Sequence, residues 1–181
     1  MQLMQQALLK GRNDAANRTR IATKDSGYAL NVALVHHDAP TRQWAGRVRD
    51  LMAAAIGPDA VRCTEWEISN LIEPKVYWEG VAALAHADVI VVSLHEAEPL
   101  PAVFYLWVNV WLQERSGLHG ALVALIVPPE EASSQAKDET RRYLSAVANQ
   151  GRLEFFMQEG NQPGEPIRDL REDIMHWALA A

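Results

Sequence analysis

The stretches DVIVVSL (Asp88–Leu94) and ALVALIV (Ala121–Val127) decide the fold of this chain. Both are nearly continuous runs of β-branched and aliphatic residues, without alternating polar positions. Strands carry apolar side chains on both sides when helices cover both faces of a parallel sheet. The two stretches therefore predict the central strands of a buried parallel sheet.

Three further segments predict strands beside this pair: Ala29–Val35 (ALNVALV), Val61–Glu67 (VRCTEWE) and Leu153–Gln158 (LEFFMQ). The segments between consecutive strands repeat apolar residues at the three-and-four spacing of helices. Asp38 or Thr41 can cap the first of these helices, and Gly57 ends it. Five alternations of strand and helix predict an α/β fold, a three-layer α/β/α sandwich around a doubly wound five-stranded parallel sheet in the order 2-1-3-4-5.

Charge divides the chain into two parts. Residues 1–29 carry five basic and two acidic side chains, whereas the whole chain has a net charge of −6, which leaves −9 for residues 30–181. We expect residues 1–29 to form a basic N-terminal tail, partly helical or mobile, and residues 30–181 to form a single domain. An acidic domain argues against nucleic acid as a partner.

Composition also bears on the compartment. Cys63 is the only cysteine, so the chain has no internal disulfide and fits a reducing environment. No apolar run approaches the roughly 20 residues of a transmembrane helix. Leu8 and Leu9 are followed at once by Lys10, which does not fit a signal peptide. We therefore expect a cytoplasmic protein without membrane attachment.

The order of elements from Asn31 to Trp177 resembles that of flavodoxins, NAD(P)H-dependent flavin reductases and response-regulator receiver domains. The closest local likeness is ADVIVVSLHEAEPLPAVFYLWVNVWL (Ala87–Leu112). It is similar to the flavin-reductase segment in which a strand is followed by a proline-containing loop and a helix with a central tryptophan. The resemblance implies a flavodoxin-like fold, and it makes FMN the cofactor to consider.

Polar residues follow the first and third predicted strands. In a doubly wound sheet, ligands bind beyond the carboxyl ends of the strands, where the winding reverses. With the order 2-1-3-4-5, this reversal lies between the first and third strands. The candidates for a ligand-binding crevice there are His36, His37, Asp38, Thr41, Ser93, His95 and Glu96.

The known chemistries of the fold fit these residues poorly. Phosphate loops use glycine and hydroxyl residues, but HHDAPTRQW has no glycine before Gly46, and Asp38 repels phosphate. A receiver needs an aspartate that accepts phosphate, and Ser93 stands at that point. FMN remains an alternative cofactor, and no cofactor is assigned.

Metal binding and nucleophilic catalysis lack a sequence motif as well. Adjacent side chains on an extended segment point in opposite directions, so only one of His36 and His37 can face a given ion. No H-x-x-x-H or C-x-x-C pair is present, so no metal is assigned. Ser93 and His95 could form a dyad oriented by Asp38, but Ser93 lies outside a nucleophile elbow. No catalytic residue is assigned.

The segment Leu100–Leu112 predicts a helix that is apolar nearly all round. Such a helix must be covered on more than one side. If Phe104, Trp107 and Trp111 face the sheet, the candidates for a dimer surface are Tyr105, Leu106, Val110 and Leu112.

Two functional interpretations remain. The first is a regulatory or protein-interaction domain without catalysis of its own, which forms a homodimer through this helix or binds an unknown protein there. The alternative is a small flavin- or nicotinamide-dependent oxidoreductase with its site in the crevice between the first and third strands.

Overall fold

The computed structural model describes residues 29–117, 119–128 and 134–180. Five parallel strands lie in the order β2-β1-β3-β4-β5. Their bounds are β1 (Leu30–His36), β2 (Val61–Glu67), β3 (Val89–His95), β4 (Gly120–Val127) and β5 (Leu153–Glu159). This arrangement confirms the predicted α/β fold and strand order.

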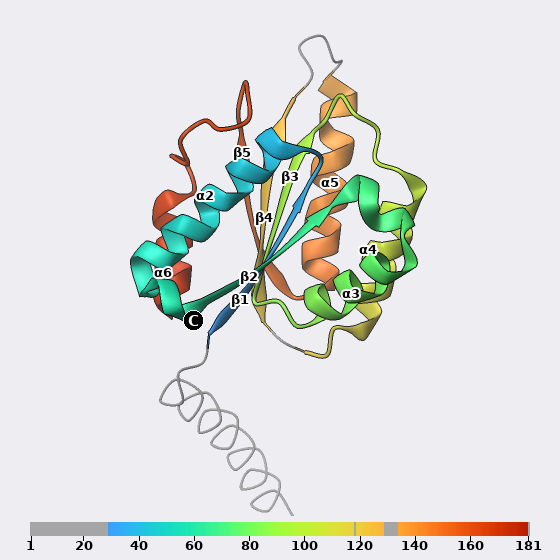
Figure 1. The fold of residues 1–181 in the computed structure, drawn as a ribbon. Helices are drawn as coiled ribbons and strands as arrows, with labels where there is room; N and C mark the ends of the chain where they lie inside the picture. Colours follow the sequence, from blue (N-terminus) through green and yellow to red (C-terminus); the bar gives the residue numbers. More distant parts are fainter. Residues whose placement is uncertain (1–28, 118, 129–133, 181) are drawn as a thin grey trace, which may run out of the picture.

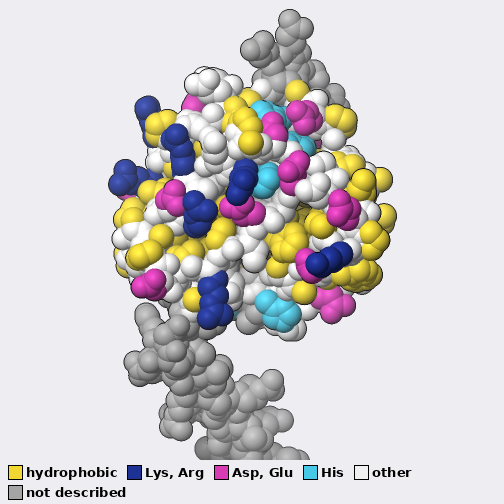
Figure 2. All heavy atoms as spheres, in the orientation of Figure 1, with side chains coloured by type: hydrophobic (Ala, Val, Ile, Leu, Met, Phe, Trp, Pro, Cys, Tyr) yellow, Lys and Arg dark blue, Asp and Glu magenta, His cyan; other side chains and the backbone are white. Residues whose placement is uncertain are grey.

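Helices cover both faces of the sheet (Figure 1). One face carries α2 (Ala39–Ile56) and α6 (Arg171–Ala180), and the other carries α3 (Pro74–Ala85), α4 (Ala102–Glu114) and α5 (Ser134–Gln150). Two short 3₁₀ helices, η1 (Pro58–Ala60) and η2 (Ile68–Ile72), flank β2. Charged side chains of both signs are interspersed over the face drawn in Figure 2.

The predicted basic tail lies outside the described residues except for Ala29. In the ranges that the structure describes, no helix combines the length and the hydropathy needed to cross a bilayer.

Burial follows the apolar runs of the sequence. All residues of β3 from Val89 to Leu94 are buried, and so are those of β4 from Gly120 to Ile126. Alternate residues of β3 enter opposite cores: Val91 packs under α2, and Val92 packs on the side of α4. The edge strands β2 and β5 are exposed along part of their length. Continuous apolar runs therefore mark the central strands, as expected for a parallel sheet covered on both faces.

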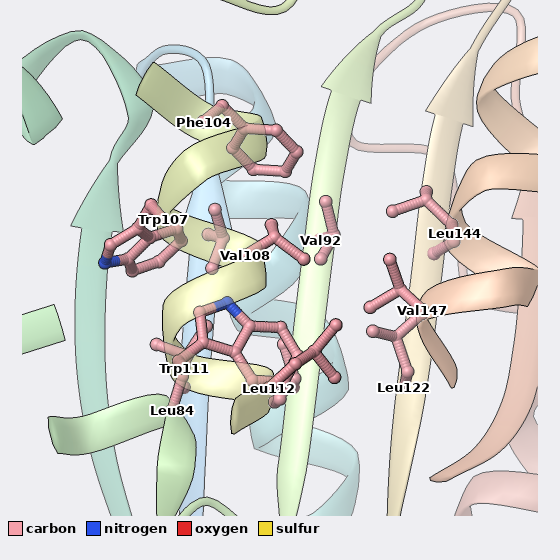
Figure 3. Close-up of a cluster of buried hydrophobic side chains, with 14 of the residues drawn as sticks. Leu84, Val92, Phe104, Trp107, Val108, Trp111, Leu112, Leu122, Leu144 and Val147 are labelled. Atoms are coloured by element: carbon pink, nitrogen blue, oxygen red, sulfur yellow. The ribbon is translucent and has the colours of Figure 1, made fainter. Parts of the chain in front are cut away.

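Helix α4 supplies the largest side chains of one core. Phe104, Trp107 and Trp111 are all buried against the sheet (Figure 3), as the sequence predicts. The indole Nε1 of Trp107 donates a hydrogen bond to the carbonyl of Tyr77 on α3 over 3.1 Å. Because Gly80 has no side chain, α3 can approach the Trp107 ring closely at this point.

The structure corrects one predicted surface residue of α4. Leu112 is only 8% exposed and lies in the core with Leu144 and Val147 of α5 (Figure 3). It follows Val108 by one helical turn, so both side chains occupy the same buried face. Leu112 was therefore wrongly assigned to a dimer surface: α5 covers the side of α4 on which it lies.

A buried arginine satisfies the helix ends at the amino edge of the sheet. The Arg115 guanidinium donates to the carbonyls of Leu84 (3.1 Å), Ala87 (2.8 Å) and Gly151 (3.2 Å). Burial lowers the pKa of Arg115 below its usual value, yet a guanidinium remains charged throughout the physiological range. One side chain thus bonds to carbonyls at or just after the C-terminal ends of α3 and α5, where helices leave carbonyls without i+4 partners.

We predict that Gly80→Ala destabilises the fold. The added Cβ would lie 2.7 Å from Cζ2 of Trp107, whose ring is fully buried. We expect the free energy of unfolding to fall by about 1–3 kcal/mol, the usual cost of overpacking. Urea denaturation would measure this as a lower midpoint at an unchanged m-value.

Gly46→Ala on α2 is the matched control. Its added Cβ would meet only the flexible end of Arg49, 3.3 Å away. Helix propensity should then dominate and raise the stability by up to about 1 kcal/mol. Equal stability of Gly80→Ala and the wild type would contradict the proposed close contact.

Candidate functional site

The carboxyl ends of β1 and β3 lie side by side at the centre of the sheet. In the parallel register, His36 of β1 is opposite Ser93 of β3. The loop after β1 leads directly into α2, and the loop after β3 leads toward α4. The structure therefore brings the two predicted polar segments together at one edge. Their role in ligand binding remains a prediction.

The N-terminus of α2 is closed by its own side chains. Asp38 is the N-cap: its Oδ1 accepts the backbone N–H of Thr41 over 3.0 Å. The Thr41 hydroxyl in turn accepts the backbone N–H groups of His37 (3.1 Å) and Asp38 (3.0 Å). This reciprocal capping box confirms the predicted cap and leaves few N–H groups free at the helix end.

The second oxygen of Asp38 faces β3. Its Oδ2 lies 3.0 Å from Nε2 of His95, which forms a hydrogen-bonded pair across the crevice. Burial acts to raise the pKa of Asp38, but hydrogen bonds from Thr41 and the charge of His95 outweigh it and lower the pKa below its usual value. Asp38 is therefore ionised at neutral pH and can orient the imidazole.

A tight turn adds a second carboxylate to this pair. The backbone N–H of Glu98 donates to the carbonyl of His95 over 3.1 Å, which folds residues 95–98 back on themselves. Donor atoms of Asp38, His95 and Glu98 consequently lie within 4.8 Å of one another. Glu96 was predicted for the crevice, but its carboxylate is outside this group. Glu98 is not among the residues predicted for the crevice; its i+3 spacing from His95 within a turn brings it there.

Two buried polar side chains lie behind the Asp38–His95 pair. Ser93 is fully buried and His36 is nearly so, and neither Ser93 Oγ nor His36 Nδ1 has a hydrogen-bond partner among the described residues. Burial lowers the pKa of His36, although the charges of Glu67 and Glu65 act to raise it. His36 is therefore neutral at pH 7. Because Ser93 is inaccessible and lacks a hydrogen bond to His95, the structure does not support it as a nucleophile.

His37 follows the last residue of β1, and its ring stacks on that of His95 with the centroids 6.2 Å apart. Its Nδ1 accepts the backbone N–H of His95 over 3.0 Å. Burial lowers the pKa of His37 as well, against the charge of Glu98, which raises it. The His37 side chain thus holds the loop after β3 in place.

A shallow groove of about 670 Å³ lies away from this edge, along α5 and β5. Its lining includes Arg142, Asn149 and Phe155. Arg141, which also lines it, is ion-paired with Glu159. This groove shares no residue with the polar crevice, so we do not assign it to the candidate site.

Solved structures similar to this chain include flavodoxins and oxidoreductases. The two-electron reduced flavodoxin of Megasphaera elsdenii has a TM-score of 0.54 at 12% identity, covering 83% of this chain and 99% of that one. An oxidoreductase of Corynebacterium diphtheriae has a TM-score of 0.52 at 17% identity, with 83% and 93% covered. An apo NADH:FMN oxidoreductase has a TM-score of 0.52 at 14% identity, with 83% and 90% covered.

The fold is flavodoxin-like. No family model and no curated protein matches the chain. Identities this low show the fold alone, so any function must be argued from the residues at the crevice.

Those residues do not fit a flavin phosphate. A phosphate at the N-terminus of a helix needs free backbone N–H groups and a positive potential. Here the N–H groups of His37, Asp38 and Thr41 are already bonded, and Pro40 has none. The Asp38 carboxylate adds a negative charge at the same point. The residues after β1 are therefore a poor match to a phosphate site of the flavodoxin kind.

We predict that FMN does not stabilise this protein. A ligand present at 100 times its Kd would raise the free energy of unfolding by about 2.7 kcal/mol. Because the phosphate would compete with Asp38 for the end of α2, we expect an unchanged Tm when FMN is added. Thermal unfolding with a flavodoxin as the positive control measures this; a rise in Tm that depends on FMN concentration would contradict the assignment.

We also predict acid destabilisation through His36. A histidine whose pKa is lowered in the folded state binds a proton more readily in the unfolded state. Its contribution to stability is therefore fully present above the pKa of the unfolded state, about 6.5. This contribution is lost as the pH falls below that pKa. Between pH 7.5 and 5.5, the free energy of unfolding should therefore fall more in the wild type than in His36→Gln.

The exposed His176 provides the control for this pH dependence. His176→Gln makes the same change of residue type at an exposed position of α6, away from the polar crevice. The difference attributable to His36 is limited to about 1.4 kcal/mol per pH unit, the maximum for one proton. Identical pH profiles for His36→Gln and the wild type, measured by urea denaturation, would rule out this role.

Proposed function

We propose that this chain is a flavodoxin-like interaction domain that pairs with a second copy of itself through the outer face of α3 and α4. The observation that carries the proposal is an apolar surface where α3, α4 and η2 meet, centred on Leu106, which is 61% exposed. The domain would act through this contact and would not catalyse a reaction of its own.

The apolar surface follows from how α3 and α4 pack. Gly80 meets Trp107, so residues one turn from Gly80 on α3, Val76 and Ala83, lie along the seam with α4. On α4, Tyr105 packs against Tyr143 of α5 with ring centroids 4.9 Å apart. Leu106 and Val110 therefore lie on the side of α4 toward α3.

We call the resulting patch the α3–α4 face. It comprises Ile72, Val76, Ala83, Leu106 and Val110. Figure 2 shows hydrophobic side chains gathered on the side of the molecule formed by these helices. Ile72 is 77% exposed, an unusual position for a large aliphatic residue unless another surface covers it.

A second copy of the chain suits this face. An apolar stripe is complementary to itself under a twofold rotation, whereas a charged surface generally is not. The charged residues beside it on α3, Lys75 and Glu79, pair with each other over 3.8 Å. Glu73, which follows Ile72, adds one exposed carboxylate at the edge of the patch, and the rest of the patch is apolar. Of the four dimer candidates from the sequence, the face retains Leu106 and Val110.

The alternative, a flavin- or nicotinamide-dependent oxidoreductase, has the fold in its favour and the closed N-terminus of α2 against it. Similarity of fold at 14% identity does not transfer a reaction.

We predict that Leu106→Glu converts a dimer into a monomer. Burying a glutamate in place of a leucine loses the apolar contact and adds a desolvation cost, so the dimer Kd should rise at least tenfold, equivalent to about 1.4 kcal/mol. Size-exclusion chromatography with light scattering should give twice the 20.2 kDa protomer mass for the wild type and the protomer mass for the variant.

Leu179→Glu on α6 is the matched control, because Leu179 is 60% exposed on the opposite layer. This variant should remain dimeric. A monomeric wild type at high protein concentration, or a dimer that Leu179→Glu breaks and Leu106→Glu does not, would refute the proposed face.

A further inference from the structure

We propose that Asp38, His95 and Glu98 bind a divalent transition-metal ion at the carboxyl edge of β1 and β3. This site is independent of the α3–α4 face. No sequence motif marks it, because its ligands come from two loops that only the fold brings together.

The donor atoms have a suitable spacing. Asp38 Oδ2 and His95 Nε2 are 3.0 Å apart, close to the separation of two ligands that share one ion at about 2.1 Å. A carboxylate oxygen of Glu98 lies within 4.8 Å of a donor atom of each of these two residues. Because the Glu98 side chain is exposed, a rotation of its flexible stem can complete the set.

The chemistry of the donors selects the class of ion. One imidazole nitrogen and two carboxylate oxygens suit Zn²⁺, Fe²⁺ or Co²⁺. With a neutral imidazole, the two carboxylates carry a charge of −2 that a divalent cation neutralises. Without an ion, the two carboxylates only repel each other.

Hydrogen bonds hold each proposed ligand in place. Oδ1 of Asp38 is fixed by the N–H and hydroxyl of Thr41 at 3.0 and 2.8 Å, which leaves Oδ2 for the ion. The backbone of His95 is held by His37, and that of Glu98 is bonded to the His95 carbonyl. Hydrogen bonds of this kind orient metal ligands in known sites.

A second observation points to the same place. Ser93 Oγ and His36 Nδ1 are buried without partners, and they lie on the face of the sheet that also carries His95, two residues beyond Ser93. An unpaired buried polar atom costs about 1–3 kcal/mol, so such atoms call for an explanation. Both atoms are closed to solvent as they stand, so a small shift of the loop after β3 that admits an ion-bound water would give them a hydrogen-bond partner. Helix capping explains the position of Asp38, but it does not explain why Ser93 Oγ and His36 Nδ1 are buried without partners.

Three protein ligands leave coordination positions open. The side chains of Asp38 and His95 are 41% and 22% exposed, so solvent reaches the site. In zinc proteins, an open position of this kind holds a water or a small exchangeable ligand. We therefore expect the ion to bind reversibly and to accept a small anion from solution.

Zinc titration of the tag-free, EDTA-dialysed chain tests the proposal. Isothermal titration calorimetry at pH 7.5 should show one Zn²⁺ per chain, and Co²⁺ should give visible absorption bands at the same stoichiometry. Glu98→Gln and His95→Ala should each weaken binding at least tenfold. Glu98→Gln alters an exposed side chain, so its fold should match that of the wild type by circular dichroism.

Two matched controls separate this site from incidental surface binding. Glu96→Gln changes the neighbouring carboxylate of the same loop and should retain full affinity. His176→Ala removes an exposed histidine elsewhere and should do the same. Leu106→Glu should also bind zinc normally, since the metal site does not depend on self-association.

Two results would contradict the proposed metal site. Absence of a 1:1 zinc complex in the wild type, or zinc binding that Glu98→Gln and His95→Ala leave unchanged, would overturn the assignment. Asp38 and His95 would then form only a structural pair between the two loops.

Discussion

The whole structure depends on the burial of β1, β3 and β4 between two helical layers. A parallel strand that is apolar on both sides cannot face water, so helices must cover both faces of the sheet. The strand order reverses direction at β1, which has β2 on one side and β3 on the other, and this reversal places helices on both faces. At this reversal, the loops after β1 and β3 lead to opposite faces of the sheet. The polar residues of both loops lie in the crevice between them.

Much of this arrangement can be predicted from the sequence. The runs Asp88–Leu94 and Ala121–Val127 identify the central strands because their composition reflects burial on two sides. The cap of α2 can also be predicted from the sequence, because Asp38 and Thr41 have the spacing of a capping box. Leu112 was misplaced because helical period tells which residues share a face but does not tell which neighbour covers it. Glu98 was not predicted for the crevice because its position depends on the turn over residues 95–98, which the amino-acid composition of the loop does not reveal.

The N-terminus of α2 shows how a fold and its usual chemistry separate. Flavodoxin-like proteins share the layout of strands, but the end of this helix is occupied by a carboxylate from the chain itself. The same carboxylate reaches across to His95, so one residue closes the helix and begins a polar cluster. A carboxylate at this loop position therefore makes the end of α2 less favourable for an anion.

Arg115 ties the amino edge of the sheet together. Its guanidinium joins three separate segments there, whereas the loops after β1 and β3 at the carboxyl edge are joined by partly exposed pairs, Asp38–His95 and His37–His95. We therefore expect local unfolding to begin at the carboxyl edge. Lysine could not replace this arginine, because a single ammonium group cannot reach carbonyls arranged around a planar fork. Loops at the opposite edge can thus diverge in evolution while the scaffold beneath them stays the same.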